Sequence, residues 1–380
     1  MKLKYKIDTI LKYNNELGKS PYAYGIEAII LGNKCLCICN NKRVFVFNKI
    51  FRLIQTINLS TLYVFPKNMI SIVNYPNLFA LQEDIYNVHI YEVQLQKKGG
   101  KVILKSSINS PKKFTDKIFY LFSLSCADIL YFFQDNFLIY NIKDKTFTNK
   151  KFSIPSEKKY ELLRHKKNII KIIEYKKNEL IILLRDIIYG KENEYYECEF
   201  NIINLIVLYD IENSELKKVY MNIEESIGNY NSYLGNYFFK NSLFSYSPNI
   251  FLINNSIIYI NDKQGEWLDH IYYSIYIINI LNGDIKYKFE DNCIDSKCFG
   301  FNELFYNFQK SIYLCDNIFL FNGYEIIVTK NDIKQNKIDF IYGTNEDDYK
   351  NNQHHFLKVK KDLFLMYNSH EIKICNFTKN

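Results

Sequence analysis

One strand–turn–strand unit recurs along this chain, and it constrains the fold more than any other feature. The clearest copy spans residues 205–220, where the apolar run Leu-Ile-Val-Leu is followed by an acidic residue, a short polar turn and a second strand with flanking lysines. The first segment has the pattern of a strand buried on both faces, and the second that of a half-exposed strand. The unit predicts a β-hairpin, and its repetition predicts an all-β chain.

Six copies of the hairpin follow one another, and a seventh shows only its first strand. The paired segments are residues 43–47 with 53–57, 88–95 with 101–104, 137–142 with 146–152, 205–208 with 216–219, 274–280 with 285–289, and 324–329 with 337–341. The fifth turn contains Asn282-Gly283, which is a strong hairpin signal. Two further apolar runs precede each hairpin, for instance residues 25–31 and 34–39. Each unit therefore predicts four short strands.

The two ends of the chain each carry a strand that has no hairpin of its own. Residues 371–377 form half a unit, and residues 4–11 form a lone strand before the first unit. Four strands repeated at roughly 44 to 50 residues is the period of a β-propeller. Pairing of the two orphan strands closes such a ring and leaves few exposed edges. We predict a seven-bladed β-propeller of four-stranded antiparallel blades, closed by pairing of the N-terminal strand with the last blade.

The length of the chain does not require a second domain, because large all-β folds run long as single units. We expect residues 1–380 to form one propeller domain. Two repeat spacings are longer than the others, and their surplus falls at residues 186–199 and 223–236. We predict that both segments are loop insertions, since loops on a rigid scaffold often carry function.

The hairpin resembles the third and fourth strands of a WD40 repeat. Tyr209-Asp210 stands where that family has Trp-Asp, and Tyr140-Asn141 and Ile278-Asn279 have the same outline. No Trp-Asp dipeptide and no Gly-His dipeptide occurs in the sequence. The resemblance implies a divergent WD40-like propeller and supplies no functional residue.

Motifs for catalysis are incomplete in this sequence. Gly18-Lys19-Ser20 resembles the end of a phosphate-binding loop, but Tyr13 occupies the position where that loop has its first glycine. No Gly-x-Ser-x-Gly nucleophile elbow is present. The carboxylate pairs Asp347-Asp348 and Glu224-Glu225 fall in predicted loops, where solvated side chains are the usual case. We therefore expect no catalytic residue, no cofactor and no enzymatic activity.

The spacing of the cysteines does not favour a metal site. Cys35, Cys37 and Cys39 alternate, so that on a strand they share one face. Zinc sites prefer two intervening residues at a turn, because the turn aims both sulfurs at one ion. Three thiols in line along a strand instead indicate small residues that face a core. Cys293 and Cys298 have no third or fourth ligand near them in the sequence. We expect no metal site and reduced thiols.

Positive charge is concentrated in the first half of the chain. Residues 1–180 carry 30 Lys and Arg against 14 Asp and Glu, whereas residues 181–380 carry 19 against 27. The lysines crowd between residues 97 and 177, mainly as pairs in predicted turns and loops. The candidate basic interaction surface consists of Lys112, Lys113, Lys150, Lys151, Lys158, Lys159, Lys166, Lys167, Lys176 and Lys177. The alternative reading is that these lysines only keep exposed segments soluble.

The functional hypotheses follow from a repeat fold without a catalytic constellation. Our main hypothesis is a non-catalytic scaffold for protein–protein interaction within a larger intracellular assembly, with protein partners whose identity the sequence does not give. The alternative is peripheral binding of acidic lipid or RNA through the lysine-rich arc, residues 97–177. The first eight residues lack the apolar run of a secretory signal, and no window of about 18 residues is apolar enough to cross a bilayer. We expect a soluble protein in the cytoplasm or nucleus.

Overall fold

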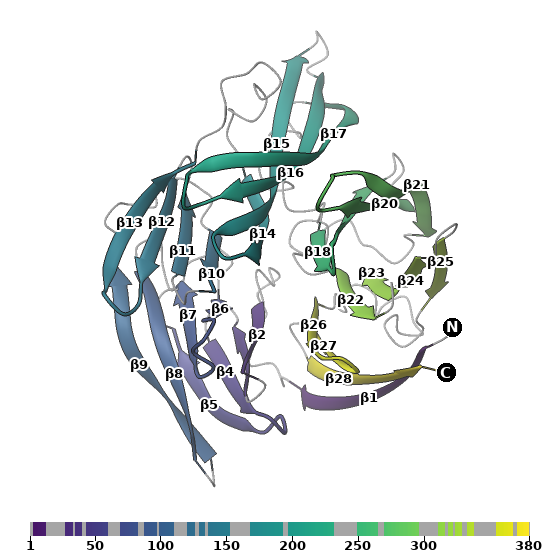
Figure 1. The fold of residues 1–380 in the computed structure, drawn as a ribbon. Helices are drawn as coiled ribbons and strands as arrows, with labels where there is room; N and C mark the ends of the chain where they lie inside the picture. Colours follow the sequence, from purple (N-terminus) through teal and green to yellow (C-terminus); the bar gives the residue numbers. More distant parts are fainter. Residues whose placement is uncertain are drawn as a thin grey trace.

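In the structure, a computed structural model, the described residues form β-strands and the turns between them. It describes residues 3–12, 27–32, 35–39, 43–59, 69–82, 87–96, 99–109, 120–125, 129–133, 136–152, 168–192, 197–231, 249–264, 270–295, 311–315, 318–321, 324–328, 333–337, 355–367 and 371–379. Within these ranges there is no helix of the length and apolarity needed to cross a membrane. The strands form seven antiparallel sheets of four strands each, arranged in a ring (Figure 1), which confirms the predicted fold.

Each sheet is one blade, and the blades are numbered along the chain. Blade 1 contains β2 (Glu27–Leu31), β3 (Cys35–Cys39), β4 (Arg43–Asn48) and β5 (Leu53–Asn58); blade 2 contains β6 (Met69–Ser71), β7 (Leu78–Gln82), β8 (Asn87–Gln96) and β9 (Gly99–Asn109). Blade 3 contains β10 (Tyr120–Ser123), β11 (Ile129–Phe133), β12 (Asn136–Asn141) and β13 (Thr146–Lys151); blade 4 contains β14 (Asn168–Lys176), β15 (Glu179–Glu192), β16 (Glu197–Asp210) and β17 (Glu215–Asn231).

The remaining three blades complete the ring. Blade 5 contains β18 (Asn249–Ile253), β19 (Ser256–Gln264), β20 (His270–Asn279) and β21 (Ile285–Asp295); blade 6 contains β22 (Ser311–Cys315), β23 (Ile318–Phe321), β24 (Tyr324–Val328) and β25 (Ile333–Lys337). Blade 7 contains β26 (His355–Lys360), β27 (Leu363–Tyr367), β28 (Glu371–Lys379) and, from the other end of the chain, β1 (Leu3–Lys12). In Figure 1 the first strand of each blade lies toward the centre and the fourth at the rim.

The seventh blade is closed by both ends of the chain, as predicted. β1 runs antiparallel to β28, in a register that pairs Leu3 with Lys379 and Lys12 with Glu371. The Tyr5 ring lies 6.2 Å from the Phe364 ring, edge to face, and 6.5 Å from the Phe377 ring. These contacts add aromatic packing to the backbone ladder. The N and C termini therefore lie side by side (Figure 1).

The hydrophobic core is divided among the contacts between neighbouring blades. Seven clusters of buried side chains lie between successive blades, including one between blades 7 and 1. In β15, Leu180, Ile182 and Leu184 pack toward blade 3, whereas Ile181 and Leu183 pack toward blade 5. A strand with a blade on either side must bury both of its faces. This is why the central strands have continuous apolar runs instead of alternating patterns.

The three alternating cysteines follow the same rule. Cys35, Cys37 and Cys39 face blade 2, while Leu36 and Ile38 of the same strand face blade 7. All three thiols are buried, and burial, with the neighbouring cysteines, raises the pKa of Cys37 well above its ordinary value. The described residues contain no group of three or more ligands that could hold a metal ion. The interpretation of these cysteines as core residues is therefore confirmed.

The sixth hairpin differs from the prediction. Its first strand is β24, as expected, but its partner is β25 at Ile333–Lys337 and not residues 337–341. Ile326 of β24 lies opposite Gln335, and Glu325 lies opposite Asn336. The prediction was wrong because it favoured the more apolar of two neighbouring segments. A fourth strand at the rim of a blade needs little apolar surface, so a polar segment takes this position.

The two predicted loop insertions also need correction. Residues 186–192 and 197–199 continue β15 and β16, and residues 223–231 continue β17. The ladder persists to Glu192 opposite Cys198 and to Glu197 opposite Asn231. The surplus therefore lengthens the strands of blade 4, which extend past the other blades in Figure 1. Residues 193–196 and 232–236 lie outside the described residues.

Candidate interaction surface

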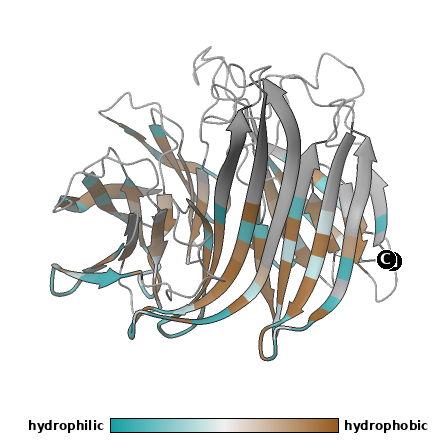
Figure 2. Ribbon diagram, turned by 90° about the horizontal axis from the view of Figure 1, so that it is seen from above, coloured by the Kyte–Doolittle hydropathy of each residue, from teal (hydrophilic) through white to brown (hydrophobic). Residues whose placement is uncertain are grey.

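The short turns of the blades gather on one side of the ring, which we call the turn face. Because the strands of a blade are antiparallel neighbours, the turns that join the first strand to the second and the third to the fourth leave the sheet on the same side. The described turns on this face are residues 49–52, 72–77, 142–145, 177–178, 211–214, 254–255, 280–284 and 361–362. In Figure 2 the tight turns line the lower edge of the ring.

An Asn or Asp ends the third strand of four blades and shapes the turn that follows. The Oδ1 atoms of Asn141 and Asp210 each accept hydrogen bonds from the backbone N–H groups two and three residues later, at 2.9–3.0 Å. The Oδ1 of Asn48 accepts from Ile50 and Arg52, at 3.1 and 3.0 Å. The Oδ1 of Asn279 binds one N–H at 3.0 Å. Side chains of this kind replace backbone partners in turns, so the residue at the position of the WD40 aspartate is structural here.

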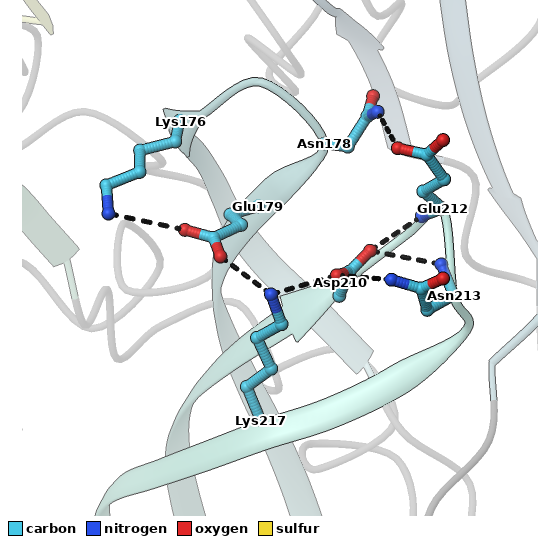
Figure 3. Close-up of polar contacts among 7 residues, drawn as sticks. All are labelled: Lys176, Asn178, Glu179, Asp210, Glu212, Asn213 and Lys217. Carbon is cyan, nitrogen blue, oxygen red and sulfur yellow. Dashed lines mark hydrogen bonds and ion pairs between the residues drawn. The ribbon is translucent and has the colours of Figure 1, made fainter.

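Blade 4 adds an ionic network to its turn (Figure 3). The ammonium group of Lys217 lies 2.9 Å from the Asp210 carboxylate and 2.7 Å from the Glu179 carboxylate. Glu179 also faces Lys176, at 4.0 Å, and the side-chain amide of Asn213 donates to Asp210 at 2.9 Å. The network thus joins the turn at residues 177–178 to the turn at residues 211–214.

Electrostatics within this network hold its carboxylate ionised. Burial opposes the ionisation of Asp210, but hydrogen bonds from Asn213 and Lys217 outweigh it and lower the pKa of Asp210 to about 2. Hydrogen bonds to Glu179 and Asp210 raise the pKa of Lys217. A carboxylate and an ammonium that stabilise each other's charge are poorly suited to exchange protons near neutral pH. The network therefore supports the turns and does not have the character of an acid–base pair.

The turn face is also connected from blade to blade. The backbone N–H of Val73 donates to Ser123 Oγ at 2.9 Å, and the backbone N–H of Ser125 donates to Glu174 Oε2 at 2.6 Å. These bonds link blade 2 to blade 3 and blade 3 to blade 4. Lys218 Nζ donates to the Leu281 carbonyl at 3.0 Å, which links blade 4 to blade 5. Hydrogen bonds thus connect the turn face from blade 2 to blade 5.

Four of the ten lysines of the predicted basic surface lie in the described residues. Lys150 donates to the Glu212 carbonyl at 3.0 Å, and Lys176 faces Glu179. Lys151 and Lys177 have exposed side chains. The other six, Lys112, Lys113, Lys158, Lys159, Lys166 and Lys167, lie outside the described residues.

The positive charge at blade 4 is compensated by acidic residues from the second half of the chain. Glu212 and Glu215 lie at the turn that Lys150 contacts, and Asp210 pairs with Lys217. Sequence reasoning missed these acidic neighbours because they are distant along the chain. It also missed the exposed aliphatic side chains of the turn face, among them Ile50 and Leu281, which are 68% and 69% exposed.

Other candidates from the sequence lie partly or wholly outside the described residues. Gly18-Lys19-Ser20, Cys298 and Asp347-Asp348 are outside them. Glu224 and Glu225 belong to β17 and pair with Ile203 and Ile202 along the ladder.

Comparison with known proteins supports the fold. No protein-family model and no curated protein sequence matches the chain. The WD40 domain of Neurospora crassa Pan2 is similar over 98% of this chain and 96% of that chain, at 7% identity and a TM-score of 0.53. The β-propeller domain of Cps50 (Swd1) from Myceliophteria thermophila covers 95% of this chain and 98% of its own, at 9% identity and a TM-score of 0.49.

A third similar structure is the WD40 domain of SCAP from fission yeast, with 6% identity, a TM-score of 0.40, and coverage of 93% of this chain and 82% of that chain. At these identities the likeness is one of fold, and it is strongest for the Pan2 domain among these three structures. The ring of blades, and the Asn or Asp that ends the third strand of four of them, agree with the resemblance of the hairpins, and the chain has the fold of a seven-bladed β-propeller similar to that of WD40 domains.

Proposed function

We propose that this protein is a non-catalytic scaffold that binds other proteins within a larger intracellular assembly. The observation that carries the proposal is the turn face, where hydrogen bonds such as Ser125 to Glu174 and Lys218 to Leu281 join one blade to the next. A surface that is already ordered loses little conformational entropy when a partner binds. The carboxylates of Asp210 and Glu179 in blade 4 are engaged by Lys217, which supports a structural role for these two residues.

The proposal is tested by purifying the full chain from its native cells under gentle conditions and determining the mass and composition of the particles. We expect a stable complex with one or more proteins in fixed ratio. A chain that is recovered only as a monomer, at physiological salt and without partners, contradicts the proposal.

The alternative from the sequence, binding of acidic lipid or RNA through residues 97–177, has less support. Lys150 donates to the Glu212 carbonyl, and Lys176 faces the Glu179 carboxylate. Binding of that kind must weaken steeply as salt rises. Titration with vesicles or RNA at increasing salt, using the wild type and a variant neutralised at Lys158, Lys159, Lys166 and Lys167, decides this alternative.

A further inference from the structure

The turn face of blades 1 and 2 combines exposed aliphatic residues with unneutralised positive charge. Ile50 is 68% exposed, Leu53 44% and Leu95 42%. Lys49 and Arg52 are next to Ile50 and Leu53 in the chain, and Lys101 lies opposite Gln94, the neighbour of Leu95, in the β8–β9 ladder. The side chains of all three basic residues are exposed. We call these six residues the blade 1–2 patch.

The two halves of the patch meet where the outer strands of the two blades touch. A Cβ atom added to Gly100 would lie 3.1 Å from Ile54 Cγ2 and 3.6 Å from the Cα of Leu95. The backbone N–H of Val102 also donates to Gln55 Oε1 at 2.7 Å across the same contact. Leu95 lies opposite Gly100 in the ladder, and Leu53 is the neighbour of Ile54 in β5, so both residues lie next to this contact between the two blades.

The turn that carries Ile50 is fixed. Asn48 Oδ1 binds two of its backbone N–H groups, and the backbone N–H of Phe51 donates to the Asn48 carbonyl at 2.9 Å. Phe51 has a left-handed backbone, with φ of 60°, and its ring packs against the core between blades 7 and 1. Because Phe51 is anchored inward, Ile50 is held outward, and a partner need not order this turn on binding.

The charge of the patch is not balanced within the described residues. The only acidic residues described in blades 1 and 2 are Glu27 and Glu92, and Glu92 is 3.0 Å from Lys105. Lys49, Arg52 and Lys101 form no ion pair in the described part of the chain. At blade 5, by contrast, the exposed Leu281 and Ile285 have the exposed Asp284 between them.

We propose that the blade 1–2 patch docks an acidic segment of a partner protein that carries aliphatic residues. The partner's aliphatic side chains pack on Ile50, Leu53 and Leu95, and its Asp or Glu side chains face Lys49, Arg52 and Lys101. These residue types in the partner complement those of the patch: apolar contacts supply affinity, and opposite charge selects and orients the partner. The patch has no exposed Trp or Tyr of the kind enriched at membrane interfaces, which favours a protein segment over a lipid surface. This inference rests on the proposed scaffold function and names the surface that performs it.

Peptide display against the immobilised full chain tests the proposal, followed by fluorescence anisotropy with one selected peptide. We expect enriched peptides to contain Leu or Ile together with Asp or Glu. The double variant Ile50→Ser, Leu53→Ser is expected to weaken binding of that peptide by about tenfold or more. The matched control is Leu281→Ser, Ile285→Ser, which removes equally exposed aliphatic residues and is expected to leave binding unchanged.

A charge reversal provides a second and independent variant. The variant Lys49→Glu, Arg52→Glu is expected to bind the acidic peptide about tenfold more weakly than the wild type does. It is also expected to bind a version of the peptide in which Lys replaces the acidic residues. Lys143→Glu, Lys145→Glu in the corresponding turn of blade 3 is the control. The proposal is overturned if the selected peptides contain no acidic residues. It is also overturned if the patch and control variants lose peptide affinity equally, or if neither patch variant changes that affinity. Binding to vesicles containing phosphatidylserine that requires Ile50, without peptide binding, also overturns it.

The failure of this inference differs from the failure of the scaffold function. If the wild type purifies with partners in fixed ratio and the Ile50→Ser, Leu53→Ser variant keeps all of them, the scaffold function stands and this docking surface is refuted. If the wild type has no partner, the scaffold function itself fails.

Discussion

At the scale of single residues, the inner strand of blade 4 carries a lysine in an apolar setting. Lys171 Nζ donates to Asn249 Oδ1 at 2.6 Å and lies 4.9 Å from the centre of the Phe251 ring, both in blade 5. Burial lowers the pKa of Lys171 to about 8. The charged form is thus disfavoured in the folded protein, although the amine still links the two blades.

The first prediction concerns the pH dependence that Lys171 creates. Between its folded pKa of about 8 and its unfolded pKa near 10.4, the unfolded chain binds more protons, so the free energy of unfolding rises with pH. We expect the contribution of Lys171 to the free energy of unfolding to rise by about 2 kcal/mol between pH 7 and pH 10. In urea denaturation, Lys171→Met is expected to lack that rise, whereas Lys360→Met, at the exposed end of β26, is expected to keep it. Identical pH profiles for all three proteins contradict the assignment.

The second prediction concerns the acidic residue that ends β16. Its pKa is lowered, so Asp210 stabilises the fold above pH 4 and loses that contribution as the pH falls from about 4 to about 2. Asp210→Asn should keep the turn, because Asn48, Asn141 and Asn279 make the same backbone contacts. Its thermal midpoint is therefore expected to fall less steeply over this pH range than that of the wild type. Asp144→Asn, in the turn of blade 3, serves as the control. If the thermal midpoint of Asp210→Asn falls with pH as steeply as that of the wild type, the stabilising role of the Lys217–Asp210 ion pair is refuted.

Residue patterns predicted the core better than the surface. The alternation of Cys35, Cys37 and Cys39 was enough to place them on one core-facing side. The role of Lys150 could not be predicted, because its partner, the Glu212 carbonyl, lies 62 residues away and is brought close only by the ring. The local periodicity of apolar residues predicts which side chains are buried, whereas charge pairing depends on contacts between distant segments.

At the scale of elements, the buried strands of each blade were easier to predict than its rim strand. β24 is recognisable because its apolar residues serve two interfaces, but β25, with Lys334 exposed, has little pattern to detect. The strand extensions of blade 4 were predicted as loops for a similar reason. Residues 186–192 and 223–231 mix polar and apolar residues, and their pairing with β16 is fixed by register and not by composition.

The third prediction tests the contact between blades 1 and 2 at Gly100. A Cβ atom there would lie 2.9 Å from the Gln94 carbonyl oxygen and 3.1 Å from Ile54 Cγ2, so part of the backbone must shift. We expect Gly100→Ala to lower the free energy of unfolding by roughly 1 to 3 kcal/mol. The neighbouring exposed residue provides the control, since Lys101→Ala should change it by less than about 0.5 kcal/mol. Equal stability of the two variants in chemical denaturation contradicts the close approach.

At the scale of the whole molecule, closure of the ring makes all blades part of one structure. The cluster that includes Phe45, Leu365 and Ile372 joins blade 7 to blade 1, and β1 completes blade 7 from the other end of the chain. The two orphan strands made this closure predictable from the sequence. Which part of the turn face carries unbalanced charge was not predictable, because it depends on how distant turns lie around the ring.

The central claim, that the two ends of the chain share one blade, is tested most directly by an engineered disulfide. Lys4 and Thr378 are opposite each other in the register of β1 and β28, and both side chains are exposed. Opposed residues of antiparallel strands have Cα atoms about 4.5 to 5.5 Å apart, within the range of a disulfide. Four native cysteines, Cys35, Cys37, Cys39 and Cys375, are buried.

The measurement is mass spectrometry of tryptic peptides from mildly oxidised Lys4→Cys, Thr378→Cys protein, without reduction. The account predicts a peptide pair that joins position 4 to position 378, and a higher thermal midpoint in the oxidised than in the reduced protein. Lys4→Cys, Asn58→Cys, which places the second thiol on the rim strand of blade 1, is expected to give no such link. Failure of the first pair to cross-link while the protein remains folded would contradict the closed ring.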